Sequence, residues 1–446
     1  MPTRTVPTRR AAARQSYRLG YATGYRQGVQ SGYQHYGTIF DGTSIIIPTF
    51  NQLGLLRQCL ESIERHTDTP YEIIVIDNAS TDGTAHYLAS LRGQIRSRVL
   101  DANKGFAAAV NIGLMMAKGT TMMLLNNDIL VTDRWLHNML VCLNSDPAIG
   151  MVGPVTNYIS GEQQIRVPYR SIAEMPVYAR KHNRSDSAQW RDAEWLRGFC
   201  LLFRRELFET VGYWDEGFEI GNYEDNDYNI RVRLAGKRLV IAADTFIHHF
   251  GSVSIRAIGS AIAESNVRNE SYYLAKWNDA GRWKSCVDEQ RSRLADAAME
   301  GEPARAGAGA GLYPELIAVQ GIGPAAYWIE GGVRRPIVGD CSVPVVQVSQ
   351  VDLRQWPVSD AIDAVEVERR WRGLNHPSGL QAGIVQQPDG PTWHVENRTL
   401  RQVISLTALE CWQLHLKPVA VVESAMLLGM PLGLPIIAPP RRIQRL

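Results

Sequence analysis

The stretch YEIIVIDNASTDGTAHYLASL, residues 71–91, holds one complete strand-and-helix unit. It opens with an apolar run from Ile73 to Ile76, which predicts a buried strand that ends at Asp77. Small polar residues then lead into a helical pattern, and Asp82 lies where a helix cap is expected. The unit therefore predicts a buried strand followed directly by a helix.

The same alternation continues on both sides of this unit. TSIIIPTF (43–50) is an apolar run before it, and LLRQCLESI (55–63) places apolar residues on one helical face. After it come a short strand, a helix and the apolar run of TTMMLLNNDILVTD (120–133). This spacing predicts an α/β fold with a mostly parallel sheet flanked by helices. Ligands of such sheets bind at the carboxyl ends of strands, where Asp77 and Asp128 are expected.

Composition excludes several classes of protein. The chain has 446 residues, which predicts two or three domains, and its net charge of +2 argues against a nucleic-acid partner. Six cysteines are scattered singly, as in reduced cytosolic proteins. No apolar run reaches the roughly 18 residues of a membrane span, and the N-terminus lacks the apolar block of a signal peptide. These features predict a cytoplasmic protein without a transmembrane span.

Residues 1–42 are expected to form a basic arm. The first 40 residues carry six arginines and no acid, so the arm can contact an acidic surface such as the inner face of a membrane. Within residues 17–37, glycines recur at every fourth position and tyrosines follow three of them. Two interpretations stay open for this segment: a helix that docks or self-associates into a homo-oligomer, or a disordered arm.

The rest of the chain divides into three parts. Strand and helix patterns extend over residues 43–300, interrupted by an irregular segment at 156–194. Residues 301–311 have the composition of a flexible linker. In residues 312–446, YWIEGGVRRPI resembles WHVENRTLRQVI, which predicts two small β-rich repeats. The repeats hold no acid or histidine cluster of catalytic type, so we expect a binding or assembly module.

Three acidic sites stand at predicted strand or helix ends. Asp77 and Asp128 each end a strand, and Glu224 and Asp225 begin a helix in YEDNDYNIR. Taken singly, these acids are equally well explained as turn or cap residues. Together they suit a nucleotide sugar, whose leaving diphosphate a divalent metal can neutralise. Carboxylates suit Mg²⁺ or Mn²⁺, and Mn²⁺ also accepts imidazole.

Seven motifs between residue 43 and about residue 255 resemble family 2 glycosyltransferases in order and spacing. They are SIIIPTFNQ, VIDNASTDGT, NKGFAAAVNIG, LLNNDILV, GFCLLFRRELFETVGYWDEGF, YEDNDYNIRVRLAG and HHFGSVS. The resemblance covers about half of the chain, is closest to the branch with bacterial rhamnosyltransferases, and implies the GT-A fold. It also implies that a sugar moves, with inversion, from a UDP- or dTDP-linked donor to a hydroxyl of a glycan or protein acceptor.

The resemblance assigns roles to residues on the donor side. Pro48 and Thr49 would belong to the pocket for the nucleotide base, and Asp77 would face the base or the ribose. Residues near the nucleotide and its phosphates would be Asn103, Lys104, Gly105 and Asn127.

The resemblance also implies a metal site. NND at 126–128 stands where many relatives have an acidic metal-binding motif, so Asp128 would bind Mn²⁺ or Mg²⁺. His249, in HFGS, matches the family's late histidine ligand. Because Asn126 and Asn127 leave one carboxylate in the motif, part of the coordination must come from elsewhere.

Glu224 and Asp225 resemble the family's acceptor-side acidic pair, in which Asp225 would be the general base. The dipole at a helix N-terminus keeps a carboxylate ionised, so we expect Asp225 to act through position rather than a raised pKa. Two other classes stay open. Asn126 and Asn127 favour a degenerate protein that binds nucleotide sugar or glycan without turnover. A nucleotidyltransferase is disfavoured, because SIIIPTFNQ lacks a glycine-rich basic loop.

Overall fold

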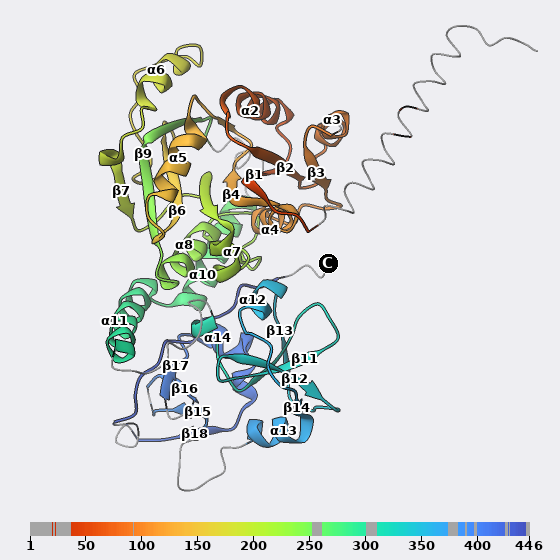
Figure 1. Ribbon diagram of the computed structural model, residues 1–446, viewed down its shortest axis with the longest axis vertical. Coiled ribbons are helices and arrows are strands. Elements are labelled where there is room, and N and C mark those ends of the chain that lie inside the picture. The colour runs from red at the N-terminus through yellow and green to blue at the C-terminus, as the bar shows by residue number, and fades with distance from the viewer. Residues whose placement is uncertain are drawn as a thin grey trace, which may run out of the picture.

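The computed structural model describes residues 20, 23, 37–91, 93–251, 261–299, 310–372, 382–388, 390–396, 399–423, 427 and 429–442. Most of the glycine- and tyrosine-rich segment at 17–37, and residues 301–309 of the expected linker, lie outside this description. Figure 1 shows an upper part with a large sheet and its helices, and a lower part rich in β-strands.

The upper part is built around a nine-stranded sheet. Its helices and strands are β1 (Phe40–Thr49), α2 (Leu53–His66), β2 (Tyr71–Asp77), α3 (Thr84–Ser90), β3 (Arg96–Val99), α4 (Phe106–Met116), β4 (Gly119–Leu125), β5 (Ile129–Leu130), α5 (Trp135–Asn144), β6 (Ile149–Thr156), α6 (Met175–His182), η1 (Ser187–Gln189), β7 (Trp190–Ala193), β8 (Cys200–Arg204), α7 (Arg205–Val211), α8 (Glu224–Leu234) and β9 (Arg238–His249). The apolar runs that predict the first central strands form β1, β2 and β4.

The strands lie in the order β3-β2-β1-β4-β8-β6-β9-β5, and β7 pairs with β9. The first four strands are parallel neighbours, so their carboxyl ends meet at one edge. β8 runs antiparallel to β4 and β6, and β5 and β7 run antiparallel to β9. The α/β class is confirmed. The sheet is mixed beyond β4, because β5, β7 and β8 run against their neighbours.

Helices cover both faces of the sheet because side chains alternate along each buried strand. Ile46 of β1 packs in the core shared with α4, α7 and α8, whereas Ile45 and Ile47 pack in the core shared with α2, α3 and α5. With both faces covered, the ends of the strands remain as the place where a ligand can reach the sheet.

The lower part contains two small sheets, which confirms the β-rich C-terminal region. Its helices and strands, with the two helices that lead to it, are α10 (Ala261–Trp277), α11 (Ala280–Met299), η2 (Ala310–Leu312), β10 (Ile317–Gln320), β11 (Ala326–Glu330), β12 (Val333–Val338), β13 (Val345–Gln347), α12 (Gln350–Arg354), β14 (Ile362–Asp363), α13 (Ala364–Arg372), β15 (Ala382–Gln386), β16 (Thr392–Glu396), β17 (Thr399–Gln402), α14 (Leu406–Cys411), η3 (Leu414–Leu416) and β18 (Val419–Val421). In each sheet, three successive strands pair antiparallel, and a later strand pairs parallel with the first.

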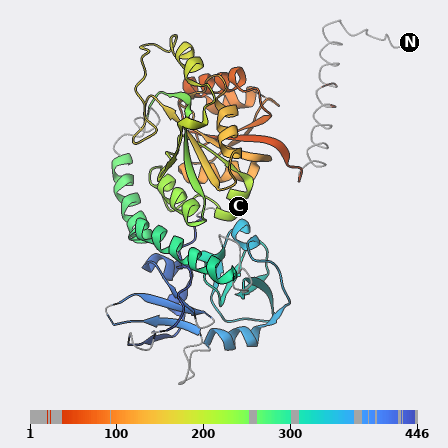
Figure 2. The ribbon, with the colours of Figure 1, turned by 60° about the vertical axis from the view of Figure 1, so that its left-hand side comes forward.

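A shared hydrophobic core joins the upper and lower parts. It includes Ile230 and Leu234 of α8, Trp277 at the end of α10, and Trp412 beside α14. Ala310, which the sequence assigns to the linker, is buried in the same core. Figures 1 and 2 show α10 and α11 between the two parts. The C-terminal sheets are therefore packed onto the α/β part through a common interior.

Two further expectations concern the chain's environment. No helix within the described ranges combines the length and apolar character needed to cross a membrane. All six cysteines are free, and three of them, Cys59, Cys142 and Cys200, are buried.

Candidate active site

A cavity of about 830 Å³ opens at the carboxyl ends of β1 and β4 and extends to the start of α8. Eight residues that the sequence singles out line it: Pro48, Thr49, Asn103, Asn127, Asp128, Glu224, Asp225 and His249. Three others do not: Asp77, Lys104 and Gly105. The fold thus brings most of the predicted site together from segments that are far apart in the chain.

Asp77 lies just behind the cavity wall. It is fully buried and paired in register with Thr49, which lines the cavity. Its Oδ1 accepts a hydrogen bond from the main-chain N–H of Ser80 at 2.9 Å, whereas its Oδ2 has no partner among the described residues. Asn127 donates from Nδ2 to the Thr49 hydroxyl at 2.8 Å, which ties the end of β4 to the end of β1.

The turn before α4 is held by Asn78. Its Oδ1 accepts from the main-chain N–H of Lys104 at 2.8 Å, and its Nδ2 donates to the carbonyl of Gly105 at 3.0 Å. The ammonium of Lys104 lies 3.3 Å from the exposed carboxylate of Asp101. Of the three predicted residues in this turn, Asn103 lines the cavity, whereas Lys104 and Gly105 do not.

Asp128 and His249 are brought together by the pairing of β5 with β9. Ile129 lies opposite His249 in this antiparallel pair, and the main-chain N–H of Phe250 donates to the carbonyl of Asp128 at 3.0 Å. The Nε2 atom of His249 lies 3.2 Å from Oδ1 of Asp128, and both side chains are 4% exposed. Neither atom has a hydrogen-bond partner in the described chain.

The surroundings of His249 fix the state of its ring. Nδ1 lies 2.7 Å from the carbonyl oxygen of Tyr158, which can only accept, so Nδ1 carries a proton. Nε2 is therefore the ring atom that faces the carboxylate of Asp128. Asn157 bonds both main-chain groups of His249, at 2.9 and 3.1 Å, and the ring of Phe199 stacks on the imidazole with centroids 5.6 Å apart.

Asp128 and His249 fit a divalent metal. A carboxylate oxygen and an imidazole nitrogen converge without hydrogen-bond partners, and this ligand pair suits Mn²⁺. In the part of the chain that the structure describes, no group of three or more His, Cys, Asp or Glu side chains could hold a metal. The remaining coordination positions would fall to a bound ligand and to water.

Glu224 and Asp225 begin α8 on the other side of the cavity. Glu224 is buried, and its Oε2 has no partner among the described residues. Asp225 accepts from the main-chain N–H of Gly198 at 3.1 Å and from that of Asn226 at 2.8 Å. Burial, with the neighbouring Asp225, raises the pKa of Glu224 to about 8. Burial also raises the pKa of Asp225, although the Arg197 guanidinium partly offsets this.

The raised pKa of Asp225 corrects the expectation that this residue acts through position rather than a raised pKa. Its side chain is partly exposed at the cavity wall, and the loss of hydration there outweighs the dipole and the two N–H bonds. In the same turn, Lys276 and Arg231 lower the pKa of Asp227 despite its burial. Asp227 is therefore a structural acid.

Arg197, Tyr158 and Tyr223 also line the cavity, and the sequence reasoning did not find them. Arg197 directly precedes GFCLLF, so extension of that motif by one residue would have included it. Tyr158 lies in the segment without periodicity, where no pattern distinguishes it. Tyr223 is the first residue of the motif YEDNDYNIRVRLAG, but the resemblance assigns it no role.

Comparison with known proteins finds a match to one family. Residues 44–212 match the sequence model described as "Glycosyl transferase family 2". The O-antigen biosynthesis protein RfbC of Myxococcus xanthus is 30% identical over 238 residues, which cover 50% of this chain and 18% of that protein. The chondroitin synthase of Pasteurella multocida is 27% identical over 226 residues, which cover 44% of this chain and 23% of that protein.

The chain therefore spans less than a quarter of the length of these two relatives. Among solved structures, the crystal structure of GalNAc-T7 with UDP, GalNAc and Mn²⁺ has a TM-score of 0.39 and 16% sequence identity to this chain. That likeness covers 59% of this chain and 58% of the other.

Proposed function

Residues 44–212 form a family 2 glycosyltransferase domain, and from this premise we propose that the protein is an inverting glycosyltransferase. It transfers a sugar from a nucleoside-diphosphate donor to an acceptor hydroxyl. The relatives named for O-antigen biosynthesis and for chondroitin synthesis support a glycan or glycoconjugate acceptor. We propose a UDP- or dTDP-linked donor. We place the reaction in the cytoplasm, with peripheral contact at the membrane.

The observation that carries this proposal is the unpaired contact between Asp128 Oδ1 and His249 Nε2. These atoms would hold a divalent ion, Mn²⁺ or Mg²⁺, at the ends of β5 and β9. When bound, the ion supplies Lewis acidity that neutralises the diphosphate as it leaves. The cavity offers one other cation, Arg197, among the described residues that line it. The leaving group therefore depends on the site of Asp128 and His249 for most of its charge compensation.

The protein's own residues would bind and orient the two substrates. Pro48, Thr49 and Asn127 border the space for the nucleotide, with the Asp77 carboxylate behind Thr49. Asp225 would accept the proton of the acceptor hydroxyl as the acceptor oxygen bonds to the anomeric carbon and the sugar–phosphate bond breaks. The nucleoside diphosphate carries away the electron pair of that bond. Direct displacement inverts the anomeric centre and needs no covalent enzyme intermediate.

A raised pKa suits Asp225 for this step. A general base is most effective when its pKa lies nearer the working pH than that of an ordinary aspartate. Glu224, whose pKa is raised to about 8, is largely neutral below that pH. A neutral Glu224 can donate a hydrogen bond to the acceptor while Asp225 takes the proton.

The test is a panel of nucleotide sugars incubated with the full chain and Mn²⁺, with free nucleoside diphosphate as the measured product. A glycosyltransferase releases nucleoside diphosphate from at least one donor, slowly with water and faster with a glycan acceptor. A binding protein would bind a donor in calorimetry and release nothing. A nucleotidyltransferase would instead release pyrophosphate from a nucleoside triphosphate and a sugar 1-phosphate.

A further inference from the structure

The loop that joins the two sides of the cavity has an unusual backbone. Ile220, Gly221, Asn222 and Tyr223 line the cavity immediately before the acidic pair of α8. Three of them have left-handed φ angles: 57° at Ile220, 77° at Asn222 and 73° at Tyr223. A β-branched residue such as isoleucine rarely adopts this region without support from its surroundings. Contacts from other elements must therefore hold the loop.

On the donor side, the loop rests against the start of α4. The main-chain N–H of Phe106 donates to the carbonyl of Ile220 at 3.0 Å. A side chain at Gly105 would lie 3.2 Å from the main-chain nitrogen of Ile220, so a close approach of the two backbones requires glycine there. One end of the loop thus touches the turn of Asn103, and the other end leads into Glu224.

The principal support comes from Asn269 of α10, which is 1% exposed. Its Oδ1 accepts from the main-chain N–H of Glu219 at 2.9 Å. Its Nδ2 donates to the carbonyls of Glu219, Gly221 and Asn222 at 2.8, 3.0 and 3.0 Å, so two hydrogens serve three acceptors. One amide therefore bonds four main-chain groups of the loop.

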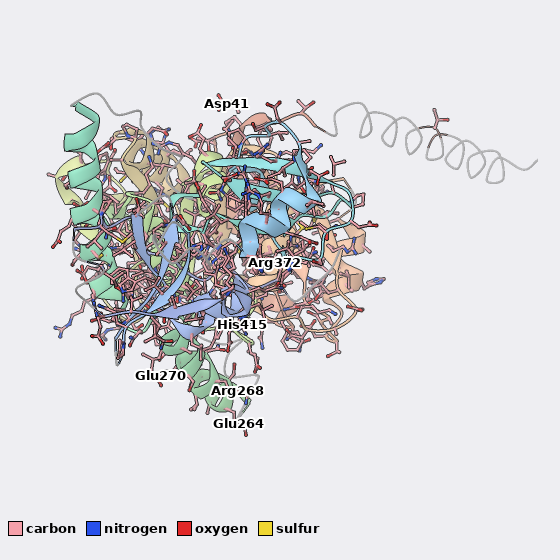
Figure 3. The ribbon with its side chains drawn as sticks, turned by 90° about the horizontal axis from the view of Figure 1, so that it is seen from below. Asp41, Glu264, Arg268, Glu270, Arg372 and His415 are labelled. Carbon is pink, nitrogen blue, oxygen red and sulfur yellow. The ribbon has the colours of Figure 1, made fainter. Side chains whose placement is uncertain are left out.

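Neighbouring residues of α10 add to this contact. Ser265 donates to the carbonyl of Glu219 at 2.9 Å, and the side chain of Asn222 donates to Asn266 at 2.7 Å. Arg268, which Figure 3 labels together with Glu264 and Glu270 on α10, also contacts the loop, because its Nε lies 2.8 Å from Oε2 of Glu219.

We infer that Asn269 is a positioning residue that sets the placement of the acceptor-side carboxylates Glu224 and Asp225 by holding the loop from Glu219 to Tyr223. The effect on catalysis that we infer rests on the proposed function. The structural part of the inference, that Asn269 holds the loop, does not depend on that function. Loss of the Asn269 amide would let Tyr223 and the start of α8 shift. A misplacement of about 1 Å at a reacting group can cost on the order of 10² in rate.

α10 itself is fixed to the rest of the protein, so it can serve as a rigid support. Lys276 lies 2.5 Å from Asp215 and 2.6 Å from Asp227, with all three side chains fully buried. Ser405 and Thr407, at the start of α14, donate to carbonyls in the last turn of α10, at 2.8 and 3.0 Å. The C-terminal region therefore contributes to the placement of the loop through this helix.

The test compares Asn269→Ala with Ser271→Ala in the full chain. Ser271 lies on the same helix and bonds only the carbonyl of Val267 in its own turn, so its variant is the matched control. Hydrogen exchange of the amides in residues 219–226 should quicken by at least about tenfold in Asn269→Ala and stay unchanged in the control. In Asn269→Ala, the affinity for UDP in the presence of Mn²⁺, measured by calorimetry, should change less than about twofold. Turnover should fall by about 10²-fold.

Unchanged hydrogen exchange in the loop of Asn269→Ala would overturn the inference, because Asn269 would then not hold the loop. Faster exchange spread evenly over the central strands would also overturn it, because Asn269 would then stabilise the whole fold and not the loop in particular. If Asn269→Ala does not fold, Asn266→Ala removes one contact at a half-buried position and should quicken exchange in the same loop by a smaller factor. If the wild type turns over no nucleotide sugar, the proposed function fails. The exchange measurement still decides whether Asn269 holds the loop.

Discussion

Nε2 of His249 faces Oδ1 of Asp128 across 3.2 Å, Nδ1 is held by the carbonyl of Tyr158, and neither facing atom has a hydrogen-bond partner in the described chain. Two buried lone pairs at this distance repel each other unless a cation or a proton lies between them. The pairing of β5 with β9, and the two hydrogen bonds between the side chain of Asn157 and the main chain of His249, nevertheless hold the atoms in place. The fold thus keeps the two proposed metal ligands together at the end of the sheet.

Asp128→Asn should remove the metal dependence of nucleotide binding. The amide keeps the size of the side chain but loses the negative charge that attracts the ion. Calorimetry with UDP should show at least about a tenfold loss of affinity in the presence of Mn²⁺ and little change in its absence. Asp133→Asn is the matched control, because Asp133 pairs with His66 and Arg180 outside the cavity. Equal loss of affinity with and without Mn²⁺ would argue against a metal at Asp128.

Asp225→Asn should reduce turnover by about 10²- to 10⁴-fold, the usual contribution of a positioned general base. The variant keeps the shape of the carboxylate but cannot accept the proton of the acceptor. Affinity for UDP with Mn²⁺ should stay nearly unchanged, because Asp225 lies at the start of α8 and the proposed metal site lies at β5 and β9. Nucleotide release and calorimetry measure the two effects separately.

Glu224→Gln is the companion variant for this assignment. Glutamine can still donate a hydrogen bond, as a neutral Glu224 would, so turnover should fall by less than in Asp225→Asn. If Glu224→Gln instead loses turnover while Asp225→Asn keeps it, the roles of the two acids are reversed. Activity in both variants would make the acids structural.

Much of the fold could be predicted because the central strands carry a local signal. The runs from Ile45 to Ile47 and from Met122 to Leu125 are buried on both faces, so hydrophobicity alone marks them as interior strands. Asp77 and Asp128 follow two of the predicted strands. Because parallel strands run in the same direction, both carboxylates could be predicted to lie at the same edge of the sheet. The prediction of Asp128 in the cavity followed from that rule and from the resemblance.

The parts that could not be predicted depend on contacts distant in sequence. Asn269 carries no motif, and its importance comes from three carbonyls that lie about 50 residues earlier in the chain. The pKa of Asp225 depends on the loss of hydration at the cavity wall, which no helix-capping pattern reveals. Likewise, the linker composition near Ala310 gave no sign that Trp277 and Trp412 would share one core.

Glu224→Gln should also change how stability depends on pH. The folded-state pKa of Glu224, about 8, lies above its usual value of 4.5, so the folded protein binds a proton that the unfolded chain releases. Its contribution to stability is present below about pH 4.5 and is lost as pH rises toward 8. The glutamine of the variant does not ionise, so the variant should melt a few degrees higher than the wild type at pH 8. A difference of 1 kcal/mol in stability shifts Tm by roughly 2–4 °C. The two proteins should converge near pH 4, and a constant difference at all pH values would contradict the assigned pKa.

Trp412→Ala should lower the stability of the catalytic part although the residue lies in the C-terminal region. The indole is fully buried, lies 4.9 Å from the ring of Tyr313 between centroids, and donates to the carbonyl of Ile437 at 2.7 Å. Loss of a buried tryptophan costs about 3–5 kcal/mol, and the core that contains it includes residues of α8.

The temperature at which nucleotide release fails should therefore fall together with the circular-dichroism midpoint, because one core supports both parts. Val365→Ala is the control at an exposed apolar position, since this side chain is 75% exposed; it should leave both midpoints in place. If Trp412→Ala produced an early transition while nucleotide release kept its wild-type midpoint, the C-terminal sheets would unfold independently. The shared core would then not couple the two parts, and the hydrogen bonds from the start of α14 to α10 would have no bearing on the active-site loop.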